Sequence, residues 1–283
     1  MFCSLFIPLP IFFYRSKLDR TTGAIIFAAS IIVMIVVVGT ISIDIFFFIE
    51  LLLLGFVLSE IIEFNLSIGK TILYACALVL SAGVLGLFFY SNIFDVGIIA
   101  FISEYIAKNL NLTIALYEKM GVPEENIRLF SSSLESIEYV LLRIIPALVV
   151  ASSFFLAWAT LLIAKPILKA RGLFYPDFGP LNLWKVPDSF VWGAIGCGLM
   201  LILPERGIKM VALNGLIILM TIYFFQGMAI VSFFFEKKRF SPVLKFFLYG
   251  LIAIQQVIML IIIGLGFSDI WLNYRKLGIK QKS

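Results

Sequence analysis

Charged side chains are rare inside the long apolar stretches of this 283-residue sequence, and Glu50 is the most conspicuous of them. It follows the run Phe46 to Ile49 and precedes four leucines. A carboxylate in hydrocarbon is costly, so it must be protonated, paired with a cation or open to a watery cavity. Glu50 is therefore the first candidate for contact with a ligand.

Three other polar side chains inside apolar stretches could complete a binding site with Glu50, namely Arg143, Asn214 and Gln226. Arg143 either snorkels toward water or reaches inward to pair with Glu50. The amides of Asn214 and Gln226 either bond a substrate or hold neighbouring helices together, which is the commoner use of such groups. Gln226 stands out because Gly227 beside it permits close approach.

Two further carboxylates, Glu60 and Glu63, lie near the end of the stretch that contains Glu50. Their spacing of three residues puts them on one face of a helix. A solvated helix end is the simplest interpretation of the pair.

No catalytic constellation accompanies these residues. The sequence has no histidine, which removes the usual general base and the commonest zinc ligand. Its cysteines, Cys3, Cys76 and Cys197, are isolated and form neither a disulfide framework nor a metal-binding spacing. Phosphate-binding glycine loops and HExxH motifs are absent too. We therefore expect no enzyme activity, no catalytic residue, no metal and no cofactor.

The composition explains where these polar groups must lie. Hydrophobic residues make up 62% of the chain and charged residues 14%, with a mean hydropathy of +1.09, whereas soluble domains are about 25% charged. The sequence therefore predicts a single all-α, polytopic domain over 1–283 in a lipid bilayer. The net charge of +5 comes mainly from turns that orient such a protein. We expect no nucleic-acid partner.

Seven stretches reach or approach the roughly 20 apolar residues that a helix needs to cross a bilayer. They are continuously apolar, which favours helices over the alternating strands of a barrel. The predicted spans are 22–40, 43–59, 71–91, 137–163, 188–204, 208–235 and 246–270. A shorter hydrophobic segment, 2–14, precedes them. The domain should thus comprise first helices in 1–91, a connector in 92–136, C-terminal helices in 137–271 and a basic tail in 272–283.

The connector between the third and fourth spans, 91–136, is partly amphipathic. Apolar residues recur at helical spacing from Ile102 to Leu110, and Gly121 followed by Pro123 marks a break. This pattern predicts two short amphipathic helices. They form either a surface connector or a lid over a pocket.

Basic residues predict the orientation of the spans. They cluster at 15–20, 70, 165–185 and 237–245, in alternate connectors, as cytoplasmic loops should. A count of seven spans puts the basic tail on the opposite side, which conflicts with the same rule. The aromatic and proline-rich connector 165–188 is expected either to rest on the bilayer surface or to dock a partner.

Several short patterns in order along the chain resemble the YybS-like family of predicted bacterial multi-pass membrane proteins, a domain of unknown function. The residues that carry the resemblance are Pro10, Arg15, Gly23, Pro187, Gln226, Gly227, Asp269, Trp271 and Arg275. Members of that family usually have a further hydrophobic helix before the first of these patterns. The start of this sequence is therefore expected to be either truncated or misassigned.

The first half of that family is similar in turn to the substrate-binding subunits of energy-coupling factor vitamin transporters and to the cell-shape protein MreD. This similarity implies a multi-pass protein of the bacterial cytoplasmic (inner) membrane. It also implies one of two functions. The chain is either a vitamin-like small-molecule binding or transport subunit with membrane or ATPase partner subunits, or an MreD-like scaffold for envelope machinery.

Overall fold

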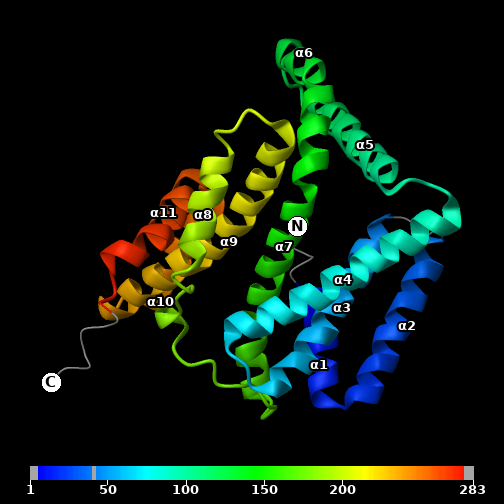
Figure 1. Ribbon diagram of the computed structural model, residues 1–283. Coiled ribbons are helices and arrows are strands. Elements are labelled where there is room, and N and C mark those ends of the chain that lie inside the picture. The colour runs from blue at the N-terminus through cyan, green and yellow to red at the C-terminus, as the bar shows by residue number, and fades with distance from the viewer. Residues whose placement is uncertain (1–5, 40–42, 277–283) are drawn as a thin grey trace. The chain divides into compact units, whose positions relative to one another are not determined.

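The computed structural model describes residues 6–39 and 43–276 of the chain, and these residues form helices and connecting turns with no β-strand among them. Figure 1 shows the helices in chain order. Their bounds are α1 Pro8–Lys17, α2 Arg20–Val38, α3 Ile43–Ile61, α4 Ile68–Phe94, α5 Ile98–Lys119, α6 Glu124–Ser132, α7 Leu134–Ala170, α8 Phe190–Met200, α9 Arg206–Lys237, α10 Pro242–Ile254 and α11 Gln256–Leu272. The predicted all-α class is confirmed.

Among the described residues, five helices are long and apolar enough to cross a membrane. They are α2, α3 with its short extension to Phe64, α4, α7 and α9, and each coincides with most or all of one predicted span. The helices α10 and α11 pass the same test together as a bent pair, which makes up to six spans. The predicted count of seven is not confirmed.

Two predicted spans differ from single full helices, for separate physical reasons. The stretch 188–204 forms only the 11 residues of α8, about 17 Å at 1.5 Å per residue, which is short of a hydrocarbon core of about 30 Å. The stretch 246–270 is broken at Gln255, whose extended backbone turns α11 by 101° from α10. Hydropathy alone does not report either interruption.

Several helices begin or end at residues that are typical helix caps. Asp19 precedes α2 and its side chain accepts a hydrogen bond from the Thr22 N–H, and Gly39 ends the helix in the left-handed conformation. Ser241 caps α10 in the same manner, just before Pro242. Such caps satisfy backbone groups that a helix end would otherwise leave unpaired.

The described helices divide into two compact units, Met1–Asp177 and Phe178–Ser283. The division lies within the aromatic connector that follows α7. Each unit is described by itself below. The single membrane domain expected from the sequence stays a prediction beside this division.

In the first unit, α3 packs against α1 and α4, and α7 packs against α4. Fully buried side chains at this core include Phe12, Leu58, Ala75 and Leu161. The contact between α1 and α3 is close, because a methyl group added at Gly55 would overlap the Pro8 carbonyl group. By contrast, only 6% of the apolar window of α2 is buried, so most of this helix is left for lipid.

The connector between α4 and α7 forms α5 and α6, which confirms the predicted pair of helices. The break falls at Gly121, which has a positive φ of 71°, and α6 begins at Glu124 after Pro123. The helix α5 packs along α7 in the same unit, where the Ser103 hydroxyl donates a hydrogen bond to the Glu138 carboxylate. One face of α5 is thus held by the long helix that follows it.

In the second unit, α9 lies between α8 and α11, and glycines set its closest approach to α11. A methyl group added at Gly227 would overlap the Ile262 carbonyl oxygen, and one added at Gly266 would overlap the Tyr223 carbonyl oxygen. Small residues that let backbones touch are a common device of membrane helix pairs.

Replacing Gly266 by alanine should therefore destabilise the second unit by roughly 1–3 kcal/mol, the usual cost of an overpacked contact. Gly264 lies in the same helix with open space around it, so Gly264→Ala is the matched control. We expect it to be neutral or up to about 1 kcal/mol stabilising through helix propensity. Thermal unfolding of the purified proteins compares the two. Equal melting temperatures would contradict the close contact.

Candidate functional site

Glu50 lies within the membrane-spanning part of α3, and its carboxylate points at α4. A methyl group added at Gly83 would overlap Glu50 Oε1, so glycine leaves the space that this carboxylate occupies. The side chain is half-buried. In the part of the chain that the structure describes, no hydrogen bond or ion pair reaches the carboxylate. A half-buried and unpaired acid inside a span is costly, which makes it a candidate contact for a ligand.

An aromatic cluster lies along the seam between α3 and α4, and it begins one helical turn from Glu50. Phe46 lies four residues before Glu50 and packs edge-on against Tyr90 of α4, with ring centroids 5.5 Å apart. Tyr90 also packs against Phe94 and against Phe101 of α5, at 4.5 Å and 4.9 Å. The aromatic cluster thus joins the start of α5 to the seam that contains Glu50.

Arg143, one of the residues predicted to accompany Glu50, interacts with its own helix. Its guanidinium carbon lies 3.3 Å from the centre of the Tyr139 ring, and its Nη1 donates to the Tyr139 carbonyl oxygen at 2.9 Å. Tyr139 is one turn nearer the start of α7, so the side chain extends away from the middle of the span. Among the described residues, no ion pair joins Arg143 to Glu50.

The other two predicted ligand contacts belong to the second unit. Asn214 donates from Nδ2 to the carbonyl oxygen of Met210, one turn back in α9, at 2.8 Å. Gln226 is fully buried, and both ends of its amide bond protein groups. This engagement favours the helix-joining interpretation of Gln226. A shared ligand site of Glu50, Arg143, Asn214 and Gln226 stays a prediction.

Gln226 belongs to a buried polar network that connects three separate segments of the second unit. Its Oε1 accepts from the Val186 N–H at 3.0 Å, and its Nε2 donates to Asp269 Oδ2 at 3.2 Å. The same Asp269 oxygen accepts from Arg275 Nη2 at 2.9 Å, and both charged side chains are almost wholly buried. Arg275 Nη1 also donates to the carbonyl oxygens of Asn182 and Trp184, each at 2.9 Å.

The network also locates the beginning of the basic tail. Arg275 reaches the connector that follows α7, and Asn182 of that connector bonds Glu236 at the end of α9. The tail therefore begins beside a basic connector, which agrees with the expectation that basic segments share one side of the membrane. A bent α10–α11 pair permits this contact, whereas a seventh straight span would carry the tail to the opposite side.

In the first unit, the structure brings Glu60 and Glu63 to Arg15 of α1. Arg15 Nε donates to Glu60 Oε1 at 2.8 Å, Nη1 bonds Glu63, and Nη1 also donates to the Ser59 carbonyl oxygen at 3.2 Å. The hydrogen bond to Glu63 raises the pKa of Arg15, and burial opposes that rise less strongly. Glu63 is more than half exposed at this helix end, as predicted, and the two carboxylates also form an ion-pair cluster that joins α1 to α3.

Gly23 completes this cluster from the side of α2. A methyl group added at Gly23 would come within 2.7 Å of Arg15 Cγ and 2.8 Å of its Cβ. A larger residue would therefore displace the arginine from its two carboxylates. The spacing of Arg15 and Gly23 in the sequence was recognised as a pattern, but only the fold shows that the two residues touch.

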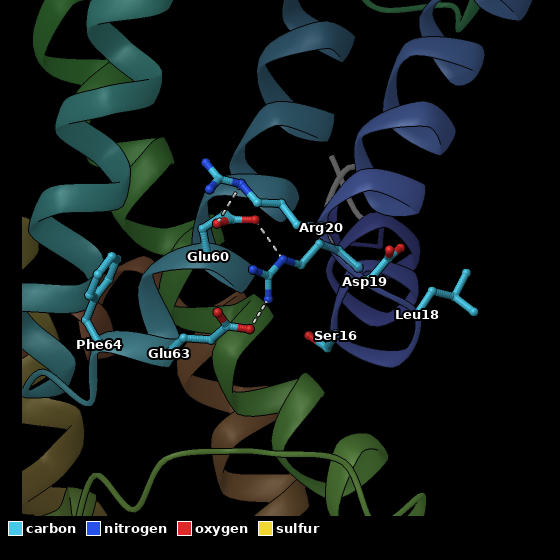
Figure 2. Close-up of a pocket in the computed structure, with 8 residues that line it drawn as sticks. Ser16, Leu18, Asp19, Arg20, Glu60, Glu63 and Phe64 are labelled. Carbon is cyan, nitrogen blue, oxygen red and sulfur yellow. Dashed lines mark hydrogen bonds and ion pairs between the residues drawn. The ribbon is translucent and has the colours of Figure 1, made fainter.

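A cavity of about 600 Å³ lies next to the ion-pair cluster, where α1, α2 and α3 end or begin. In Figure 2, Leu18 and Asp19 stand on one side of it and Phe64 on the other, and Arg20 extends over Glu60. The lining residues are Arg15, Ser16, Leu18, Asp19, Arg20, Glu60, Glu63 and Phe64. The cavity is polar and holds both signs of charge.

The helices and the buried charge clusters define a multi-pass helical membrane protein. A family model described as "Predicted membrane protein (DUF2232)" matches residues 1–270, and the chain belongs to this family. It is also similar to "Uncharacterized protein YybS" of Bacillus subtilis (strain 168), with 27% identity over 158 residues. That match covers 55% of the chain and 50% of the relative, so the chain spans about half the length of the curated relative it matches. The predicted family resemblance is confirmed. No solved structure matches the chain significantly.

Several residues on which the family resemblance rests meet in these clusters. Arg15 and Gly23 touch in the first unit, while Gln226, Asp269 and Arg275 form the network of the second. Pro187 follows directly on Val186, which bonds Gln226. Two others lie apart, because Pro10 and Trp271 are exposed at helix surfaces.

Removing the arginine of the buried network should leave Asp269 charged and unpaired. We expect Arg275→Ala to cost about 3–5 kcal/mol, as observed when one partner of a buried ion pair is removed. Arg275→Lys should recover little, because a single ammonium cannot match a planar guanidinium that bonds a carboxylate and two carbonyl oxygens. Thermal unfolding of the purified variants measures both.

The neighbouring Lys276 is exposed, so Lys276→Ala removes the same charge without touching the network. It should leave stability within about 0.5 kcal/mol of the parent. If Arg275→Ala unfolds at the same temperature as Lys276→Ala, the network does not stabilise the second unit.

Proposed function

We propose that this protein is a small-molecule binding or transport subunit of the bacterial cytoplasmic membrane, and that it is not an enzyme. The observation that carries the proposal is the carboxylate of Glu50 inside α3, which no described side chain neutralises. Architecture does not account for it, since the packing of α3 on α4 would be simpler with an apolar residue. A group supplied by a ligand accounts for it directly.

The surroundings of Glu50 indicate the chemical class of the ligand. A carboxylate with one aromatic ring a helical turn away and further rings beyond it is a suitable environment for a cationic amine, because the acid pairs with the charge and a ring face attracts it. Phe46, Tyr90 and Phe101 supply such rings. We therefore propose a vitamin-sized ligand that carries a protonated amine or a comparable hydrogen-bond donor.

The contact between α5 and the aromatic cluster supports the predicted lid. Phe101 packs against Tyr90, so a movement of α5 would open or cover the end of the α3–α4 seam. For transport, energy would come from membrane or ATPase partner subunits, as the similarity to energy-coupling factor transporters expected from the sequence implies. This role rests on analogy of fold, which does not identify the ligand.

A second candidate function is an MreD-like scaffold, and one observation favours it. The helices α5 and α6 expose large apolar side chains that no other described segment covers, among them Leu112, Leu116, Met120 and Leu129. Such a face suits a bilayer surface or a protein partner. Copurification of the full chain with cell-wall machinery would favour the scaffold, and copurification with an ATPase pair would favour transport.

The transport proposal is tested by screening the purified protein for thermal stabilisation by amine-bearing metabolites. A ligand at 100 times its Kd should add about 2.7 kcal/mol. Glu50→Gln should abolish this stabilisation while leaving the protein folded. Gly83→Ala should weaken it too, because the added methyl group overlaps Glu50 Oε1.

Two control variants keep this test specific. Glu104 is exposed on α5, so Glu104→Gln removes a carboxylate outside the seam. Gly196→Ala adds a methyl group in open space in the second unit. Both should retain ligand stabilisation. A ligand that stabilises Glu50→Gln as strongly as the parent protein would remove Glu50 from the proposal.

A further inference from the structure

The cavity beside Arg15 has accessible charges of both signs at its mouth. Arg15 itself is engaged by two carboxylates and a carbonyl oxygen. Arg20, however, is 77% exposed, and its ion pair with Glu60 is long, at 3.4 Å between Nε and Oε2. Glu63 is 56% exposed. A guanidinium and a carboxylate are thus both accessible from the same cavity.

Asp19 adds a second accessible carboxylate. The hydrogen bond of the Thr22 hydroxyl, and after it that of the Thr22 N–H at the start of α2, lowers the pKa of Asp19. The residue is exposed and stays ionised at neutral pH. The lining as a whole contains two cationic and three anionic side chains, so a simple anion meets net repulsion. An occupant needs a cationic group as well as an anionic one.

The position of the cavity indicates an amphiphilic occupant. It lies at the polar ends of two membrane-spanning helices, α2 and α3, at the level where lipid headgroups sit. Leu18 and Phe64 flank it and are 50% and 70% exposed. Their apolar surface continues the lipid-facing side of α2, which is largely unburied. A molecule with a charged headgroup and acyl chains would fit both the charged lining of the cavity and its apolar flank.

We propose that this cavity binds the headgroup of an aminophospholipid, with the phosphate at Arg20 and the primary ammonium at Glu63 and Asp19. Guanidinium matches phosphate geometry well. A primary ammonium donates hydrogen bonds to carboxylates, whereas the methylated ammonium of a choline headgroup has no N–H to donate. The cavity should therefore select phosphatidylethanolamine over phosphatidylcholine, and also over phosphatidylglycerol, which lacks the cation.

The proposal is tested with the full chain in nanodiscs in which one lipid is varied against a constant background. Retention of each lipid by the purified protein is measured by native mass spectrometry, and the melting temperature is followed in parallel. We expect phosphatidylethanolamine to be retained several-fold more than the other two lipids and to raise the melting temperature. Equal retention of phosphatidylcholine would overturn the proposal.

Variants of the accessible charges locate the site. Arg20→Gln should weaken phosphatidylethanolamine retention about tenfold, since a charge-assisted hydrogen bond is lost, and Arg20→Lys should restore part of it. Asp19→Asn keeps a helix cap but removes the charge, and should reduce the preference for the ethanolamine headgroup. Lys17→Gln removes a nearby charge that does not line the cavity and should change nothing. If Lys17→Gln and Arg20→Gln lowered phosphatidylethanolamine retention equally, the placement of the headgroup at Arg20 would be wrong.

Two further measurements separate this proposal from its competitors. Soluble phosphoethanolamine carries the same headgroup without acyl chains, so stabilisation by it equal to that of the lipid would overturn a lipid occupant. Glu50→Gln should leave the lipid preference unchanged, because Glu50 does not line the cavity. Failure of the ligand proposal for Glu50 would therefore not affect the result at Arg20.

Discussion

The cost of placing a charge in an apolar environment is the constraint on which the rest of this structure depends. Two arginines are nearly buried. The cost of burying each guanidinium is offset by ion pairs and hydrogen bonds with protein groups. Arg15 bonds Glu60, Glu63 and a carbonyl oxygen, and Arg275 bonds Asp269 and two carbonyl oxygens. Arg15 thereby joins α1 to the end of α3, and Arg275 joins the end of α11 to the connector that follows α7.

Glu50 is the exception to this rule within the described residues, and the exception gives it functional interest. The α3–α4 seam provides space for its carboxylate by placing Gly83 opposite, but it provides no cation. If Glu50 had a structural role, we would expect a larger side chain to fill the seam and a cation to pair with the carboxylate. Water, a proton or a ligand must therefore offset the free-energy cost of the unpaired Glu50 carboxylate inside the span.

Hydropathy predicted the helical class and the long spans well, because a bilayer imposes a minimum length on every crossing helix. It failed where length and bending matter more than composition. The stretch around α8 is apolar enough, but its helix ends after 11 residues. The break before Gln256 interrupts an apolar stretch at a polar pair, and average hydropathy over the window conceals two such residues. The predicted pair of connector helices was confirmed because Gly121 and Pro123 are local signals.

The candidate sites were predictable to different degrees for a related reason. Glu50 was found from the sequence, because an acid in an apolar run is visible locally. The partners of Arg15 lie more than 40 residues away and those of Arg275 up to 93, so only the fold reveals them. The polar residues that carry the family resemblance, Arg15, Gln226, Asp269 and Arg275, use their hydrogen-bonding groups to hold separate segments together. They therefore define the architecture and say little about a ligand. Ligand chemistry has to be sought among charges that the architecture leaves unpaired or weakly paired, such as Glu50 inside a span and Arg20 at a polar end.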